Sequence, residues 1–260
     1  MAQISKIEWC DATWNPVTGC TKVSEGCANC YAERMSPRFA GRFGYPSDNP
    51  FQVTLHADKL DWRWGPKCPK RVFVCSMGDL FHEDVPFEWI DKVFHRINYS
   101  HPNLTFLMLT KRPERMLQYF KARPSGYVIG ISGGSMRPVY RSWPMPNLWI
   151  GVTIELPKYS YRASYHLLEC PAAVRFISFE PLLASFEDCP GVLDGIDWVI
   201  CGAESGHKAR YIDPDWVCQL RDRCVSRKIP FFFKGWANCS SYPALRGRLL
   251  DNRTWDELPK

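Results

Sequence analysis

The stretch that decides the fold is LTFLMLTKRP, residues 104–113. Its first six residues are mostly apolar and favour a strand, and the run ends abruptly in the polar residues 110–112. Pro113 then opens a segment whose apolar side chains recur with helical spacing. A nearly continuous apolar strand is typical of a parallel sheet with both faces covered. The stretch therefore predicts a strand followed by a helix, the repeating unit of α/β folds.

The same succession of apolar run and polar end recurs along the chain. Five further runs have this character: residues 71–75, 148–154, 174–179, 198–201 and 230–233. Another strand is predicted around residues 4–9, and helix-like segments follow Pro86 and Asp213-Pro214. About six to seven parallel strands alternating with helices predict an α/β fold, in the form of a partial or complete (β/α) barrel. An open doubly wound sheet stays as the alternative, because periodicity alone does not separate the two.

Two stretches interrupt this rhythm, at about residues 33–66 and 121–147. Both are rich in Pro, Gly, Arg and aromatic residues and show no clear period. Loops of such length are usually functional, so we interpret them as a lid or a substrate-binding surface, with plain surface insertions as the alternative. No linker divides the chain, and one domain over residues 1–260 is expected.

Composition and charge narrow the class of protein. Of the 260 residues, 45% are hydrophobic and 23% charged, which argues against a disordered chain. No apolar run approaches the roughly 20 residues that span a bilayer, and the N-terminus has no secretory pattern. A cytoplasmic protein without a membrane partner is therefore expected. The net charge of +6 is compatible with a polyanionic partner but is weak grounds for one.

Polar residues follow the predicted strands from residue 71 onward, at the end where parallel α/β folds place their sites. These residues are Gly78, Asp79, Lys111, Glu155, Glu180, Gly202, Glu204 and Lys234. Taken singly, each is more typical of a helix cap or a solvated loop. Because the carboxyl ends of parallel strands meet at one edge of a sheet, the set as a whole predicts a binding site there.

A cysteine cluster lies in TGCTKVSEGCANCY, residues 18–31, just after the first predicted strand. Cys20, Cys27 and Cys30 have the spacing C-x6-C-x2-C, and the Gly, Ser and Asn residues between them indicate a loop. Four thiolates usually hold an iron–sulfur cluster, and three leave one iron open to a small molecule. The spacing alone leaves three interpretations open: an iron–sulfur site, a zinc site completed by Cys10 or Cys68, or plain structural thiols.

Further short motifs accompany the cysteines. They are Trp14-Asn15-Pro16, Gly26-Cys27-Ala28-Asn29-Cys30-Tyr31-Ala32, Ser76-Met77-Gly78-Asp79-Leu80-Phe81, Leu109-Thr110-Lys111-Arg112-Pro113, Gly151-Val152-Thr153, Ser178-Phe179-Glu180-Pro181-Leu182 and Gly202-Ala203-Glu204-Ser205-Gly206. With them the chain resembles the radical S-adenosylmethionine (SAM) superfamily, and more closely a phage-associated family of unknown function assigned to it, over about residues 4–240. One feature departs from the superfamily, whose commonest spacing is C-x3-C-x2-C. Six residues separate the first two cysteines here, which leaves Cys20 and Cys10 as alternatives for the first ligand.

The resemblance implies a cofactor site. Cys20, Cys27 and Cys30 would hold a [4Fe-4S] cluster whose fourth iron binds SAM. Gly78 and Asp79 would contact the methionine amino group, Glu155 the ribose hydroxyls, and the strand end with Gly202 and Glu204 the adenine. Lys111, Arg112 or Lys234 would pair with the SAM carboxylate or a substrate phosphate, and Glu180 belongs to the same set.

The function expected from the resemblance is that of a radical SAM enzyme in which the cluster reductively cleaves SAM to a 5′-deoxyadenosyl radical. Its substrate is unknown, with a nucleotide or nucleic acid as the class considered, and its partner would be a flavodoxin-like or ferredoxin-like electron donor. The alternative is a zinc- or cluster-stabilised nucleic-acid-binding protein without catalysis, with Arg- and aromatic-rich loops on the polyanion.

Overall fold

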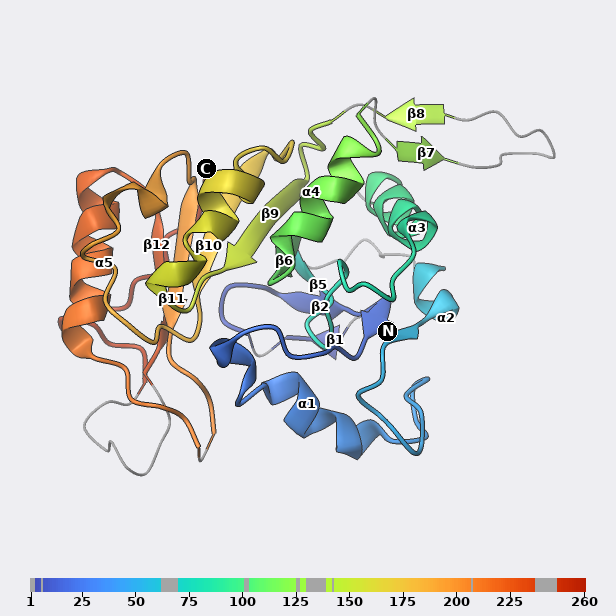
Figure 1. Cartoon of the computed structure of the whole chain (residues 1–260), viewed down its shortest axis with the longest axis horizontal. Helices are drawn as coiled ribbons and strands as arrows, with labels where there is room; N and C mark the ends of the chain where they lie inside the picture. The colour runs from blue at the N-terminus through green and yellow to red at the C-terminus, as the bar shows by residue number, and fades with distance from the viewer. Residues whose placement is uncertain are drawn as a thin grey trace.

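One curled sheet forms the centre of the computed structural model (Figure 1). The structure describes residues 3–5, 7–61, 70–100, 103–124, 127–129, 139–141, 143–206, 208–236 and 247–260. The strands of the sheet lie side by side in the order β1 (Gln3–Ile4), β2 (Ala12–Trp14), β5 (Arg71–Val74), β6 (Thr105–Thr110), β9 (Leu148–Thr153), β10 (Val174–Phe179), β11 (Trp198–Gly202) and β12 (Phe231–Gly235).

The strand order confirms a partial (β/α) barrel. β1 runs antiparallel to β2, and all pairs from β2 to β12 are parallel. The seven parallel strands follow the order of the chain without a reversal. A doubly wound sheet has a switch point where the order reverses, so the alternative of an open doubly wound sheet is wrong.

Helices cover the convex face of the sheet, where the sequence predicts them. They are α3 (Phe87–Asn98), α4 (Pro113–Lys121) and α5 (Pro214–Ser226). The predicted cap of α5 is confirmed, because the Asp213 carboxylate accepts a hydrogen bond from the backbone N–H of Asp215 at 2.9 Å. Between β9 and β10 the chain forms a π-helix, η4 (Arg162–Leu167), and between β10 and β11 a 3₁₀ turn, η5 (Pro190–Leu193). Neither has the apolar period of an α-helix.

The first parallel strand lies later than predicted. Residues 7–10 form a turn in which the Cys10 N–H donates to the Ile7 carbonyl oxygen at 3.2 Å, and the parallel strand is β2. Trp9 is almost fully buried in this turn. The apolar character of residues 4–9 therefore reflects burial in a turn as well as the short strand β1.

The concave face of the half-barrel is filled by large side chains near the amino ends of the strands. They are Trp9, Phe73, Leu107, Trp149, Phe176, Trp198 and Phe232. Side chains alternate between the two faces of a strand, so the same face continues toward the carboxyl ends with Lys111, Thr153, Glu180 and Lys234. An apolar floor thus lies beneath a polar rim.

The two predicted insertions contain some regular structure. Within 33–66 the chain forms η2 (Ser36–Phe39), β4 (Thr54–Leu55) and α2 (Ala57–Leu60), and β4 pairs with β3 (Val17–Thr18). Within 121–147 it forms the hairpin of β7 (Tyr127–Ile129) and β8 (Val139–Arg141). Residues 62–69 and much of 125–142 lie outside the described part. In the described part of the chain, no helix combines the length and apolar character needed to cross a membrane.

Candidate functional site at the carboxyl ends of the strands

The polar residues predicted from the sequence lie along the carboxyl edge of the sheet, as expected. The edge also carries the cysteine loop, which we define as residues 19–30. Its start lies against the end of β5, because the Gly19 N–H donates to the Met77 carbonyl oxygen at 2.9 Å. A Cβ atom on Gly78 would be 2.9 Å from the Gly19 carbonyl oxygen, so this close approach requires glycine.

Asp79 joins the ends of β5 and β6. Its carboxylate is buried and accepts hydrogen bonds from Thr110 Oγ1 at 2.8 and 2.9 Å, from the Lys111 N–H at 3.1 Å and from the Phe81 N–H at 3.0 Å. Arg112 Nη1 lies 3.5 Å from the same carboxylate. All these partners come from the two strand ends, so Asp79 fixes the position of Lys111 and Arg112 relative to β5.

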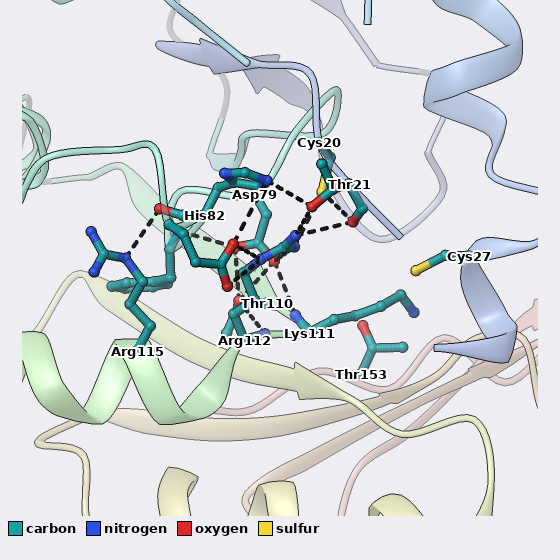
Figure 2. Close-up of polar contacts among 12 residues, drawn as sticks. Cys20, Thr21, Cys27, Asp79, His82, Thr110, Lys111, Arg112, Arg115 and Thr153 are labelled. Atoms are coloured by element: carbon teal, nitrogen blue, oxygen red, sulfur yellow. Dashed lines mark hydrogen bonds and ion pairs between the residues drawn. The ribbon is translucent and has the colours of Figure 1, made fainter. Parts of the chain in front are cut away.

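Arg112 links this corner to the cysteine loop (Figure 2). Its Nη1 donates to Cys20 Sγ at 3.2 Å, and its Nη2 donates to the carbonyl oxygen and hydroxyl of Thr21 at 3.0 and 2.8 Å. The guanidinium also bonds to Glu83 through Nε at 3.0 Å. Burial raises the pKa of the Cys20 thiol to about 12, the Asp79 carboxylate adds to this increase, and the Arg112 cation opposes it.

His82 completes the contacts around Thr21. Its Nδ1 accepts from the Asp84 N–H at 3.1 Å, and its Nε2 lies 2.9 Å from Thr21 Oγ1, so in the neutral ring Nε2 is the donor. Burial, together with the nearby Arg112 cation, lowers the pKa of His82. The neutral imidazole is therefore favoured at the edge of the site.

Glu155, at the end of β9, is the most deeply buried acidic group of the site. It is fully buried and accepts from Ser24 Oγ at 2.6 Å, Lys111 Nζ at 2.6 Å and Arg162 Nη1 at 2.8 Å. Burial alone would raise the pKa of this carboxyl, but the Lys111 and Arg162 cations and the hydrogen bonds hold it below its usual value. A Cβ atom on Gly26 would be 2.4 Å from Glu155 Oε1, so the loop passes directly over the carboxylate.

Glu204, after β11, holds the far end of the loop. Its carboxylate accepts from Asn29 Nδ2 at 2.9 Å and forms a second set of bonds with the N–H and Nε of Arg210 at 2.9 and 3.0 Å. Burial would raise its pKa, but the hydrogen bonds from Arg210 and Asn29 outweigh that effect and lower it. The cysteine loop is thus attached to the ends of β5, β6, β9 and β11.

Glu180 and Lys234 form an ion pair on the concave face. Each keeps partial contact with solvent, with about a quarter of its side chain exposed. A Cβ atom on Gly202 would be 3.1 Å from the Lys234 Cβ, so the glycine makes room for this lysine. The Tyr31 hydroxyl donates a hydrogen bond to the Ser76 carbonyl oxygen. Burial raises the pKa of this hydroxyl, and the negative charge of Glu180 adds to the increase.

The three clustered cysteines are all partly exposed. Cys27 Sγ lies 3.6 Å from Ser24 Oγ, and in Figure 2 its sulfur points inward, toward the side of the site with Lys111 and Thr153. Cys30 immediately precedes α1 (Tyr31–Met35), and the Lys22 ammonium pairs with Glu33 of that helix at 3.0 Å. Cys10 is buried and donates to Ser5 Oγ at 3.3 Å, and burial raises its pKa to about 11.

The arrangement of the cysteine sulfur atoms bears on whether the loop suits a single zinc ion or an iron–sulfur cluster. In the described part of the chain, no three His, Cys, Asp or Glu side chains converge tightly enough to hold a single ion. A tetrahedral zinc site requires sulfur atoms about 2.3 Å from one ion, and Cys68, a predicted fourth ligand, lies outside the described residues. In a cubane each thiolate bonds to a different iron, so its ligands stay farther apart than around one ion. The three partly exposed thiols share one loop and have the donor chemistry of iron–sulfur ligands, but within the described residues they are not gathered around one point.

A pocket opens beside the cysteine loop, between the start of α4 and η4. Its volume is 340 Å³, within the range of small-molecule pockets. Val23 of the loop lines it together with Lys111, Arg112, Arg115 and Tyr161. The pocket therefore connects the outer surface with the buried charges behind the cysteines.

Sequence reasoning missed the residues that attach the loop. Thr21, Ser24 and Asn29 lie between the cysteines, and Arg162 and Arg210 lie beyond the strand ends. In the sequence, only the polar character of the side chains between the cysteines could have indicated this attachment, and polar side chains are equally typical of solvent-exposed loops. Their partners became recognisable only when the strand ends were placed at one edge.

The comparisons with known proteins give one match. No curated protein and no solved structure matches the chain. A family model described as a protein of unknown function (DUF5131) matches residues 4–259, nearly the whole chain. Both the cysteine loop and the residues at the strand ends lie within the matched range. The chain therefore belongs to the DUF5131 family of proteins of unknown function.

Proposed function

We propose that the chain is a radical SAM enzyme in which Cys20, Cys27 and Cys30 hold a [4Fe-4S] cluster. The observation that carries this proposal is the attachment of the cysteine loop to the ends of β5, β6, β9 and β11, at the mouth of a half-barrel. When bound, the cluster would supply the electron that cleaves SAM to methionine and a 5′-deoxyadenosyl radical, which takes a hydrogen atom from a substrate.

The surroundings of the three thiols support metal ligation. Arg112 donates to Cys20 Sγ, Ser24 Oγ lies beside Cys27 Sγ, and Lys22, which pairs with Glu33, carries a positive charge near Cys27 and Cys30. Burial raises the pKa of the Cys20 thiol, and the Arg112 cation opposes this effect and so stabilises the thiolate, which is the form that binds metal. The Ser24 hydroxyl donates to Glu155, so the cation near Cys27 and Cys30 is Lys22.

The strand-end residues have different roles in this proposal. Glu155 is fully buried and has three hydrogen-bonding partners, so it positions the cysteine loop. Glu204 does the same through Asn29. Lys111 and Lys234 keep about a quarter of their side chains exposed and can reach the carboxylate of SAM or an anionic group of the substrate.

The remaining residues predicted to bind SAM are two glycines and two acidic residues at the strand ends. Gly78, beside the cysteine loop, and Asp79 border the place where the methionine amino group would lie. Gly202 is buried beside Lys234 and leaves room for its side chain, and Glu180 holds Lys234 in position. The apolar floor of the half-barrel excludes water from below, which protects a reactive radical from side reactions.

The proposal includes an external electron donor, of the flavodoxin-like or ferredoxin-like kind, and a cytoplasmic location. The outer side of the cysteine loop is accessible to such a partner. Lys22 and Lys158 are each more than half exposed there. Each pairs with a glutamate, Glu33 and Glu25 respectively, so this surface carries both signs of charge for a partner to match.

The decisive experiment measures 5′-deoxyadenosine formed from SAM by anaerobically reconstituted protein, reduced with dithionite. The wild-type chain should be brown, contain about four irons and four sulfides, and cleave SAM. Cys27→Ala should lose both properties. Cys218→Ala is the matched control, because Cys218 is also a half-buried free thiol but lies on α5. It should keep the colour and the cleavage.

Two further measurements test which cysteine is the first ligand and whether the metal is iron or zinc. Cys20→Ala should lose the cluster and Cys10→Ala should keep it, because Cys10 is buried against Ser5 away from the loop surface. Colourless protein that retains stoichiometric zinc after iron–sulfide reconstitution, and that leaves SAM intact, would overturn the proposal in favour of a zinc-stabilised binding protein.

A further inference from the structure

A basic and aromatic ridge lies on the segment that follows the cysteine loop. We define the basic ridge as Arg34 in α1, Arg38 in η2, and Arg42 and Phe43 in the turn after η2. All four side chains are exposed, Phe43 to 70%. In Figure 1 this segment runs along the side of the molecule below the mouth of the half-barrel.

The positive charge of the ridge is not neutralised by its surroundings. Within the described residues, none of the three arginines forms an ion pair, and Arg34 donates only to the Ser205 carbonyl oxygen at 3.1 Å. The acidic residues of this segment are few. Glu33 pairs with Lys22, and Asp48 is the next carboxylate along the chain. The arginines therefore present their charge to solvent.

Phe43 is held in an unfavourable backbone conformation that exposes its ring. Its φ is 53°, a left-handed conformation that a bulky residue rarely adopts, and it lies between Gly41 and Gly44, which also have positive φ. The ring contacts Phe39 only edge-on, with the centroids 6.2 Å apart. Burial of such a ring is favourable, so a ligand that covers it would recover the cost of its exposure.

The turn is rigid. The Arg42 N–H donates to the Phe39 carbonyl oxygen at 2.8 Å, and the Tyr45 N–H donates to the Arg42 carbonyl oxygen at 2.9 Å. A Cβ atom on Gly44 would be 2.7 Å from His56 Nδ1, so the turn packs directly on that histidine. The ring of Phe43 is thus presented on a fixed base.

The ridge is attached to the cysteine loop at both of its ends. α1 begins directly after Cys30, and His56, which supports the turn, bonds to Thr18 Oγ1 at 2.7 Å, two residues before Cys20. The Cys20 N–H also donates to the Phe51 carbonyl oxygen at 3.3 Å. A ligand bound along the ridge would therefore lie beside the candidate site in a defined position.

We infer that the basic ridge binds single-stranded nucleic acid, with the arginines on phosphates and an unpaired base stacked on Phe43. Arg34 and Arg38 lie four residues apart on the consecutive helices α1 and η2, about 6 Å along the axis, a separation comparable to one nucleotide step of an extended strand, and Arg42 follows in the turn. Base stacking on an exposed aromatic ring requires a base outside a duplex, which favours a single strand over a double helix. The inference deepens the proposed function and rests on it only for the identity of the substrate.

The test is fluorescence anisotropy with labelled oligo-dT and oligo-U of about 12 nucleotides, on the full-length protein at several salt concentrations. The triple variant Arg34→Gln, Arg38→Gln, Arg42→Gln should bind at least about tenfold more weakly and lower the salt slope by about 2. Phe43→Ala should weaken binding about fivefold or more at unchanged salt slope. The pair Arg38→Gln, Arg42→Gln retains the Arg34 contact with Ser205 and should show the same trend. The two probes distinguish DNA from RNA.

The matched control removes the same charge elsewhere. Lys92→Gln in α3, Lys121→Gln in α4 and Lys228→Gln in the turn after α5, all exposed, should leave affinity within about twofold. Equal weakening by both triple variants, with no effect of Phe43→Ala and equal competition by heparin or anionic vesicles, would overturn the inference. The binding readout needs no SAM. Cleavage of SAM without oligonucleotide binding therefore contradicts the ridge alone, and binding without cleavage contradicts the proposed enzyme alone.

Discussion

Ser24 Oγ lies 2.6 Å from Glu155 Oε1, although 131 positions separate the two residues. The bond joins the middle of the cysteine loop to the end of β9. On its other side the same carboxylate holds Lys111 and Arg162, so one buried anion connects the loop with two cations. The position of Cys27, three residues after Ser24, therefore depends on a charge cluster that lies beneath the loop.

Replacement of Glu155 by Gln should destabilise the protein. Lys111 and Arg162 would remain near each other without a countercharge. We expect the free energy of unfolding to fall by about 3 kcal/mol. This value is at the lower end for a broken buried ion pair, because the Lys111 side chain stays partly solvated. Urea unfolding of the anaerobic apo-protein measures this loss. Glu25→Gln is the control, since Glu25 is an exposed carboxylate that also bonds to a lysine, Lys158. Equal stability of the two variants would contradict the role given to Glu155.

Acid should weaken the same attachments. The pKa values of Glu155 and Glu204 are lowered below the ordinary value of 4.5, so in the folded protein both carboxyls stay ionised to lower pH than in the unfolded chain. Their stabilising contribution is present above pH 4.5 and is lost as the pH falls through the folded-state values. The free energy of unfolding, measured from pH 7 down to pH 3, should fall below about pH 4.5, and Glu155→Gln should fall less steeply. A variant curve parallel to that of the wild type would count against this account.

Much of the fold could be predicted from the sequence, because strands buried on both faces consist almost entirely of apolar residues. The run at 174–179 coincides with β10, and Pro113 and Pro214 begin helices as predicted. β2 was missed because three residues are too short for a recognisable period. The loop character of residues 19–30 followed from its Gly, Ser and Asn content. The hydrogen bond from Asn29 to Glu204 could not be predicted from the sequence, because the two residues are 175 positions apart.

Gly26 should tolerate no larger residue. An alanine Cβ would be 2.4 Å from Glu155 Oε1 and 2.5 Å from its Cγ, so the loop would have to move away from β9. We expect Gly26→Ala to lower the free energy of unfolding by about 1–3 kcal/mol, the usual cost of overpacking. Gly191→Ala, on an exposed turn where the nearest atom would be 3.2 Å away, should have little effect.

A second substitution can separate a steric cause from a conformational one at Gly26. Glu155→Asp shortens the side chain that the new methyl group would meet. In a double-mutant cycle, Gly26→Ala combined with Glu155→Asp should therefore be more stable than the sum of the two single losses by about 1 kcal/mol. Strict additivity would show that the alanine acts through the backbone and that Glu155 is not the obstacle.

Arg112 should be irreplaceable by lysine, because its contacts require a fork of several donors. One guanidinium reaches Cys20 Sγ, both oxygens of Thr21 and the carboxylate of Glu83, whereas a single ammonium cannot span these directions. We expect Arg112→Lys to lose about 2 kcal/mol of stability and to retain less iron after reconstitution. Arg123→Lys is the control, because Arg123 is forked onto Asp91 through Nε and Nη2 at 3.1 and 2.8 Å, away from the cysteines. It should lose comparable stability and keep its iron. Equal iron in the two variants would mean that the bond from Arg112 to Cys20 does not support the ligand, and that Arg112 serves only to connect β6 to the loop.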